Sequence, residues 1–214
     1  MLIVHHLGVS QSDRIVWLCE ELELPYELRR YDRDPVTMAA PPEYKALHPF
    51  GTAPVITDGD LVLGESTAIV EYLCRTYAGG RLLVGPDDPE YANFLFWFHF
   101  ANGSILPAVM MEMAAVMFGV EPAKAAAHPA GSSRTDKAYA MADIRLGEAD
   151  YFAGDALSAA DIMMVFTLTT MRRFAARDIA PYPNIHTYLK RIGARAAYRR
   201  AMEKADPGVP LMLD

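Results

Sequence analysis

The spacing of hydrophobic and polar residues predicts strands and helices in the first third of the chain and helices alone after it. Residues 2–5 form an apolar run of strand length, and apolar residues recur at helical spacing from Ile15 until Pro25 ends the pattern. Residues 26–31 then alternate apolar and charged side chains, as a half-buried strand does. The order strand, helix, strand predicts a βαβ unit of the size that a parallel sheet needs.

A hairpin and a second helix are predicted next. Two β-rich runs, residues 55–57 and 61–63, are separated by Asp-Gly-Asp, and Gly59 readily takes the positive φ of a tight turn. An apolar stripe at helical spacing begins near Ser66 and ends at Gly79. We therefore predict an α/β domain over residues 1–78.

Residues 79–88 are rich in glycine and aspartate and predict a linker, and the pattern beyond them is helical. A long apolar segment is expected to be kinked near Gly103 and Pro107. We therefore predict an all-helical domain over residues 89–214. Its expected helices cover residues 91–118, 134–149, 158–173 and 183–204.

Composition and charge narrow the class of protein. Hydrophobic residues make up 52% and charged residues 22%, which indicates a folded globular chain rather than a disordered one. A net charge of −7 provides no basic patch for nucleic acid or anionic membranes. Apolar runs such as residues 94–98 are shorter than the roughly 20 residues that span a bilayer, so we expect no membrane partner and a cytoplasmic location.

The two cysteines, Cys19 and Cys74, each stand alone in a predicted helix. Two isolated cysteines form neither a disulfide framework nor a metal-ligand cluster, so we expect small buried hydrophobic side chains and no metal site.

Two short segments have chemistry suited to an amino-acid ligand. Pro54 follows Ala53 directly before a predicted strand, where an X-Pro bond can be cis and nearby backbone groups can pair with an extended ligand. Glu65 and Ser66 open the second helix, so a helix N-terminus and the Ser66 hydroxyl can hold a carboxylate while Glu65 accepts from an ammonium. Taken singly, Pro54 also suits a strand start and Ser66 an N-cap.

Residues 45–56 and 63–72, which contain both segments, resemble the amino-terminal thioredoxin-like domain of glutathione transferases. The resemblance implies that Pro54 is cis and that the backbone of Ala53 pairs with the cysteinyl unit of glutathione. It implies further that Glu65 and Ser66 hold the γ-glutamyl group.

The C-terminal part resembles the same family. Residues 154–162 are similar to its helix-initiating motif, in which Ser158 and Asp161 have capping-box spacing with Asp in place of Glu or Gln. Residues 183–201 resemble its terminal helices, with Ala196 where a proline is usual. The resemblance covers nearly the whole chain and implies a thioredoxin-like domain followed by the family's all-helical domain, with the active site in the cleft between them.

The residue that activates the thiol is expected between the first strand and the first helix. The family places Tyr, Ser or Cys there, and this sequence has neither a tyrosine nor a cysteine at the junction, which argues against the thiol-exchange branches. Ser10, four residues ahead of Arg14, resembles the serine-type pattern, and we predict that Ser10 stabilises the thiolate. Ser12 is the alternative, Val9 aligns with the active residue of some branches, and either serine also suits an N-cap.

Further residues have weaker assignments. Lys45 can reach the glycyl carboxylate or be a solvated charge, and His48 replaces the usual Asn and is expected to be structural. His99 and Asn102 resemble a fungal and bacterial pattern in which this helix faces glutathione, although a lone His is more often a core group. Four methionines can form a pliable pocket for electrophiles or pack in a helix core, and we expect most of them in the core. They are Met110, Met111, Met113 and Met117.

The resemblance implies a glutathione S-transferase that conjugates glutathione, as co-substrate, to small hydrophobic electrophiles in detoxification. It implies a homodimer and no metal. Two alternatives stay open: a noncatalytic glutathione-binding or regulatory module that shares the fold, and a glutathione-dependent peroxidase.

Overall fold

The computed structural model describes residues 1–120 and 133–214, which form two compact units. Unit 1 contains Met1–Leu83 and Ile192–Leu211, and unit 2 contains Val84–Arg191 and Met212–Asp214. The first boundary lies within the predicted linker, whereas Ile192–Leu211 fold with unit 1 rather than with the helices that precede them. The division into a domain over 1–78, a linker and a domain over 89–214 stays a prediction about family domains.

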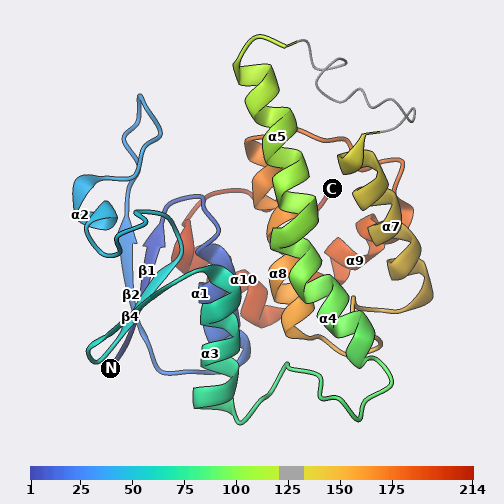
Figure 1. Cartoon of the computed structure of the whole chain (residues 1–214), viewed down its shortest axis with the longest axis horizontal. Coiled ribbons are helices and arrows are strands. Elements are labelled where there is room, and N and C mark those ends of the chain that lie inside the picture. Colours follow the sequence, from blue (N-terminus) through green and yellow to red (C-terminus); the bar gives the residue numbers. More distant parts are fainter. Residues whose placement is uncertain (121–132) are drawn as a thin grey trace. The chain divides into compact units, whose positions relative to one another are not determined.

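Unit 1 is built on a four-stranded mixed sheet with the order β2-β1-β3-β4 (Figure 1). β1 pairs with β2 in parallel and with β3 antiparallel, which confirms the predicted βαβ unit and hairpin. Helices α1 and α3 pack against each other and against the sheet. The elements are β1 Leu2–Leu7, α1 Asp13–Glu21, β2 Glu27–Tyr31, α2 Pro42–Lys45, β3 Val55–Asp58, β4 Leu61–Gly64 and α3 Ser66–Ala78.

β1 runs two residues beyond its predicted end because it lies inside the sheet. A strand with both faces covered is apolar almost throughout, and β1 departs from this only at two buried histidines. Successive side chains point to opposite faces, so His5 reaches the Tyr31 hydroxyl at 2.9 Å while His6 reaches the Ser12 hydroxyl at 2.9 Å.

Helix α10, Ala196–Ala205, completes unit 1 by packing along α1. The rings of Trp17 and Tyr198 meet edge to face with centroids 5.1 Å apart. Arg195 binds the Glu21 carboxylate through two nitrogens, at 2.7 and 2.8 Å. Glu20 accepts from Arg200 at 3.1 Å and also from Lys204, so two nearly buried carboxylates fasten the last helix to the first.

This attachment is expected to weaken in acid. Burial raises the pKa of Glu20 and Glu21, but their hydrogen bonds to cationic side chains outweigh burial, and both pKa values lie below the ordinary value of 4.5. A carboxylate with a depressed folded pKa contributes stability above its unfolded pKa and loses it as the pH falls through the folded value. Glu21→Gln should therefore lower the free energy of unfolding by about 1–3 kcal/mol at pH 7 and by less near pH 3.5.

Urea denaturation at the two pH values measures this difference, and Glu23→Gln provides the control. Glu23 is exposed two residues after Glu21, so its variant changes the same charge without touching α10. Equal losses for the two variants at pH 7 would contradict the role of Glu21.

The described elements of unit 2 are helices, joined by loops that contain one isolated β-bridge between Tyr151 and Gly154 (Figure 1). The predicted helix over 183–204 is divided at Arg195, whose backbone is extended, and the chain after α8 tightens into a 3₁₀ turn. Helix α9 begins in unit 2, and its last residues count with unit 1. The elements are α4 Tyr91–Phe100, the π-helical segment η1 Ala101–Ile105, α5 Leu106–Met117, α7 Arg134–Glu148, α8 Ala159–Leu168, the 3₁₀ segment η2 Thr170–Arg173 and α9 Pro183–Ala194.

The core of unit 2 surrounds α8, in which every residue is buried. Its N-terminus has the predicted capping box: the Ser158 hydroxyl accepts a backbone N–H of the first turn, and the Asp161 carboxylate accepts the backbone N–H of Ser158 at 2.8 Å. Asp161 also accepts from the backbone of Phe152 and the hydroxyl of Tyr188, each at 3.0 Å. A sequence motif for helix initiation is thus also a fully buried hydrogen-bonding centre.

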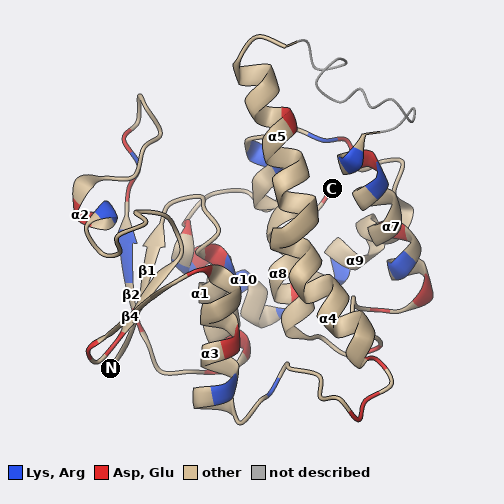
Figure 2. Ribbon diagram, in the orientation of Figure 1, with Lys and Arg blue, Asp and Glu red and all other residues tan. Residues whose placement is uncertain are grey.

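The irregularity expected near Gly103 is the π-helical segment between α4 and α5. The combined helix, Tyr91–Met117, is long and apolar enough to cross a membrane by length and composition alone, with a mean hydropathy of 1.4 over its most apolar window. Figure 2 shows how few charged residues it carries. We expected no apolar segment of this chain to be long enough to span a bilayer. That expectation was wrong, because short apolar runs join into one continuous helix. Core helices of soluble proteins meet the same criteria, and the absence of a membrane partner stays a prediction.

Candidate active site

The β1–α1 turn, residues 8–12, is held from two directions within unit 1. Val9 has a positive φ of 47°, an uncommon conformation for a β-branched residue. Its N–H donates to Asp206 Oδ1 at 3.0 Å, and the guanidinium of Arg33 donates to the carbonyl of Gly8 at 2.8 Å. A carboxylate just after α10 and an arginine just after β2 thus fix the turn in place.

The two serines of this turn form a buried hydroxyl pair. Ser10 Oγ and Ser12 Oγ lie 2.7 Å apart, and Ser10 Oγ also lies 2.7 Å from the carbonyl of Leu7. Ser12 Oγ accepts the N–H of Leu7 at 3.1 Å and lies 2.9 Å from His6 Nδ1. Ser12 occupies the N-cap position of α1, but neither hydroxyl bonds the free N–H groups of the helix. The interpretation of these serines as side-chain N-caps is therefore wrong.

The segment before β3 lies beside this turn. The Ala53–Pro54 bond is cis, as the resemblance implies. Leu7, at the end of β1, packs with Tyr44 and Val55 in a buried cluster against which Ala53 also packs. The sheet therefore brings Ala53 and Pro54 close to the chain that leads into the serine turn.

The start of α3 lies at the same edge of the sheet. Val55 pairs with Gly64, so Glu65 and Ser66 follow directly after the strand that neighbours Pro54. Glu65 has a positive φ of 67° and an exposed side chain, whereas Ser66 is buried. These two residues and the serine turn are thus brought together within unit 1.

A buried arginine connects the two helix N-termini. Arg14 Nη1 donates to Ser66 Oγ at 3.3 Å. Burial lowers the pKa of Arg14 to about 10, which leaves the guanidinium charged at neutral pH. The carboxylates of Asp13 and Glu65 act on this cation, so the start of α3 offers N–H groups that suit a ligand carboxylate beside a Glu65 carboxylate that suits an ammonium. The sequence analysis noted Arg14 only as part of the serine-type pattern and did not foresee this contact.

Lys45 and His48 lie near the same edge in different environments. Lys45 is the exposed last residue of α2, and its role toward a glycyl carboxylate stays a prediction. The His48 ring accepts the N–H of Phe50 at 3.3 Å and lies against Gly64, with ring atoms 3.4 Å from where a Cβ would stand. These contacts support the expected structural role of His48.

His99 and Asn102 belong to unit 2. His99 is exposed near the end of α4 with its ring 5.3 Å from that of Phe98, and Asn102 is half-buried in η1. Neither environment tests whether these residues face glutathione, and that role stays a prediction.

The methionines of α5 differ from the expectation of a helix core. Met110, Met111 and Met117 are exposed, and Met113 is only half-buried. The expectation of a core was wrong because α5 leaves one side uncovered by the described helices. Met113 and Met117 instead line a cavity of about 440 Å³.

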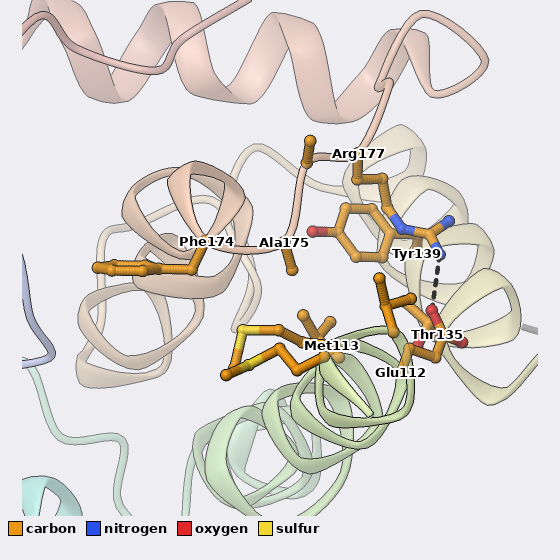
Figure 3. A pocket seen from close by; sticks show the side chains of 11 residues that line it. Glu112, Met113, Thr135, Tyr139, Phe174, Ala175 and Arg177 are labelled. Carbon is orange, nitrogen blue, oxygen red and sulfur yellow. Dashed lines mark hydrogen bonds and ion pairs between the residues drawn. The ribbon is translucent and has the colours of Figure 1, made fainter. Parts of the chain in front are cut away.

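This cavity is mostly apolar with one ionic side (Figure 3). Phe174 and Tyr139 lie on opposite sides of it, and Met113 projects from α5 between them. The guanidinium of Arg177 stacks on the Tyr139 ring at 4.9 Å and pairs with Glu112 at 3.4 Å. An apolar molecule can pack against the thioethers and aromatic rings of such a lining.

In the described part of the chain, neither cysteine is exposed for thiol chemistry and no cluster of side chains is placed to hold a metal ion. Cys19 and Cys74 are both buried, and burial raises the pKa of both thiols, that of Cys74 to about 12. No group of three or more His, Cys, Asp or Glu side chains among the described residues is placed to hold a metal ion. The expectation of a metal-free enzyme stays a prediction.

The sequence analysis missed three residues that build the site: His6, Arg33 and Asp206. No pattern indicated a role for His6, and Arg33 lay in a segment without a pattern. Asp206 stands 197 residues after Val9, to whose N–H it binds, and no local pattern links the two.

A mixed sheet with a cis-proline before β3, followed by a helical unit with a buried capping box, defines the architecture of glutathione transferases. The comparisons agree: residues 10–76 match the glutathione S-transferase N-terminal domain, and residues 106–196 match the C-terminal domain. The chain therefore belongs to the glutathione S-transferase family, whose members use glutathione as a substrate, and it is an enzyme of that family.

The alignments with individual relatives cover nearly the full length of this chain. Glutathione S-transferase 3 of Schizosaccharomyces pombe is 32% identical, over 96% of this chain and 88% of the relative. Glutathione S-transferase 1 of Saccharomyces cerevisiae is 29% identical, over 94% of each. The crystal structure of a glutathione S-transferase from Actinobacillus pleuropneumoniae is 31% identical with a TM-score of 0.86, over 97% of this chain and 95% of that one. Homodimer formation and a cytoplasmic location stay predictions.

Proposed function

We propose that the enzyme binds glutathione at the serine turn of unit 1 and transfers its thiolate to small apolar electrophiles. Ser10 donates a hydrogen bond to the thiolate, Ala53 pairs with the cysteinyl backbone, and Glu65 with Ser66 holds the γ-glutamyl group. The observation that carries the proposal is the buried Ser10–Ser12 hydroxyl pair, which is not used to cap α1. Such a donor stabilises the charged form of a thiol whose pKa is otherwise about 8.5.

The cavity within unit 2 supports the proposed class of electrophile, because a cavity of this size can hold a small apolar molecule. Its thioether and aromatic lining suits small aromatic or aliphatic molecules, since methionine side chains adapt to varied shapes. Lys45, His99 and Asn102 complete the proposed set of glutathione-binding residues.

Ser10→Ala should lower kcat/KM for conjugation of a generic aryl halide about 10- to 100-fold, the effect of losing one hydrogen bond to a charged group. Glutathione affinity should change little, because the tripeptide keeps its other contacts. Steady-state conjugation assays and titration calorimetry measure the two quantities. Thr76→Ala, which removes an exposed hydroxyl from α3, should behave as the wild type.

Three outcomes would contradict parts of this proposal. Glutathione binding without any conjugation by the wild type would remove the transferase assignment. Reduction of hydroperoxides without conjugation would assign a peroxidase instead. Unchanged turnover in Ser10→Ala, together with its loss in Ser12→Ala, would transfer the role from Ser10 to Ser12.

A further inference from the structure

A row of four polar side chains leads from the end of α10 to the proposed thiol site. Asp206 Oδ2 lies 3.2 Å from His6 Nε2, His6 Nδ1 lies 2.9 Å from Ser12 Oγ, and Ser12 Oγ lies 2.7 Å from Ser10 Oγ. His6 and Ser12 are fully buried, and Ser10 is 6% exposed. His6 Nε2 is buried, and its contact with Asp206 is at ion-pair distance but outside hydrogen-bond geometry.

The charge of Asp206 sets the positions of the protons in this row. Burial raises the pKa of Asp206, but its contacts with His6 and the N–H of Val9 outweigh burial, and the net shift is downward. A carboxylate at this position favours the tautomer of His6 with its proton on Nε2, which leaves Nδ1 as an acceptor. Ser12 then donates to Nδ1.

The Ser10 hydroxyl has two acceptors at 2.7 Å, the carbonyl of Leu7 and Ser12 Oγ. When it turns to Ser12, both hydroxyl protons point toward His6, and Ser10 Oγ is left with a lone pair for an incoming proton. The order serine, histidine, aspartate matches that of serine hydrolases, with the roles of the two ring nitrogens exchanged.

We propose that His6 takes up the glutathione thiol proton through Ser12 and Ser10, and that Asp206 is a positioning residue that acts through His6. The S–H bond breaks as Ser10 Oγ accepts the proton, Ser10 passes its own proton to Ser12, and Ser12 passes its own to His6 Nδ1. The products are a thiolate that accepts a hydrogen bond from Ser10 and an imidazolium beside the Asp206 carboxylate. After the conjugate leaves, the same hydroxyls return the proton to water. This inference rests on the proposed binding of glutathione at the serine turn.

Asp206 is the carboxylate that faces His6, and two arginines share its charge. Arg30 stands opposite His6 in the sheet register, and its charge also acts on Asp206. Arg33 binds the carbonyls of Gly8 and Val9, and its own charged form is favoured by Asp206. An imidazolium at His6 would pair with the same carboxylate.

The test is a pH titration of the glutathione thiolate bound to the enzyme, followed by ultraviolet absorbance. Asp206→Asn and His6→Asn should each move the titration of the bound thiol to higher pH by one unit or more, a tenfold loss of thiolate near neutral pH, and the pH profile of kcat/KM should move with it. Ser12→Ala should do the same with His6 and Asp206 intact. Glu203→Gln removes an exposed carboxylate from α10, the helix that precedes Asp206, and should leave the titration unchanged.

A second measurement tests the proton positions in these four side chains in the free enzyme, without glutathione. Nitrogen NMR of the free wild-type enzyme should show the Nε2–H tautomer of His6, and the Nδ1–H tautomer would overturn the proposal. Wild-type thiol titrations in Ser12→Ala and His6→Asn would also overturn it, whether or not Asp206→Asn folds. A wild type that binds no glutathione would instead remove the proposed function and this inference with it, so the two failures are distinguishable.

Discussion

Asp161→Ala is expected to destabilise the enzyme by about 3–5 kcal/mol, among the largest effects that a single substitution produces. The carboxylate accepts the backbone N–H groups of Phe152 and Ser158 and the hydroxyls of Ser158 and Tyr188. Alanine would leave these donors in a fully buried place without an acceptor, and each buried unsatisfied group costs about 1–3 kcal/mol before the structure relaxes. The start of α8 would lose half of its capping box as well.

Urea denaturation followed by circular dichroism measures the loss, with Asp155→Ala as the matched control. Asp155 is exposed and lies six residues before Asp161, so its variant removes the same charge without leaving a buried donor unpaired. Its effect on the free energy of unfolding should stay within about 0.5 kcal/mol. A similar loss in both variants would show that net charge, and not the buried hydrogen bonds, carries the effect.

Glu65→Ala is expected to weaken glutathione binding about 100-fold or more. Truncating one partner of a buried hydrogen-bonded charge pair costs about 2–5 kcal/mol, and in the proposed function the ligand covers this carboxylate, which pairs with the glutathione ammonium. Glu65 holds an uncommon backbone conformation at the start of α3 and has an exposed side chain. Its carboxylate also favours the charged form of the buried Arg14 guanidinium, so circular dichroism of the variant must show an intact fold before the loss of affinity is assigned to the ligand.

Titration calorimetry of Glu65→Ala and Glu65→Gln separates charge from shape, because glutamine keeps the length of the side chain. Glu71→Ala is the control, since Glu71 lies on the same helix and forms only an exposed ion pair with Arg75. Unchanged affinity in both Glu65 variants would remove this residue from the glutathione site.

Local patterns predicted the elements of the fold well. The hairpin around Gly59, the helix that begins at Ser66 and the capping box of Ser158 and Asp161 each depend on residues a few positions apart. Their geometry is decided by turn conformation, helical periodicity and backbone donors, all of which can be read from a short stretch of sequence.

The parts that could not be predicted depend on partners far apart in the chain. Nothing near Asp206 indicates that it binds the turn at Val9, and nothing near Glu21 indicates Arg195. The methionines of α5 were placed in the core because their composition is that of a core helix, yet exposure depends on which neighbours cover the helix. The sequence indicated both serines of the turn. Their arrangement as a hydrogen-bonded pair beside His6 could be seen only in the structure.

The attachment of α10 to α1 has a consequence for biosynthesis. The sheet and α1 are synthesised before α10, and Arg195 is made 174 residues after its partner Glu21. Until α10 and Asp206 emerge, Glu20 and Glu21 have no cationic partners and the turn at Val9 lacks the carboxylate that fixes it. A nascent chain that has not yet reached α10 therefore holds the proposed glutathione residues without their final support.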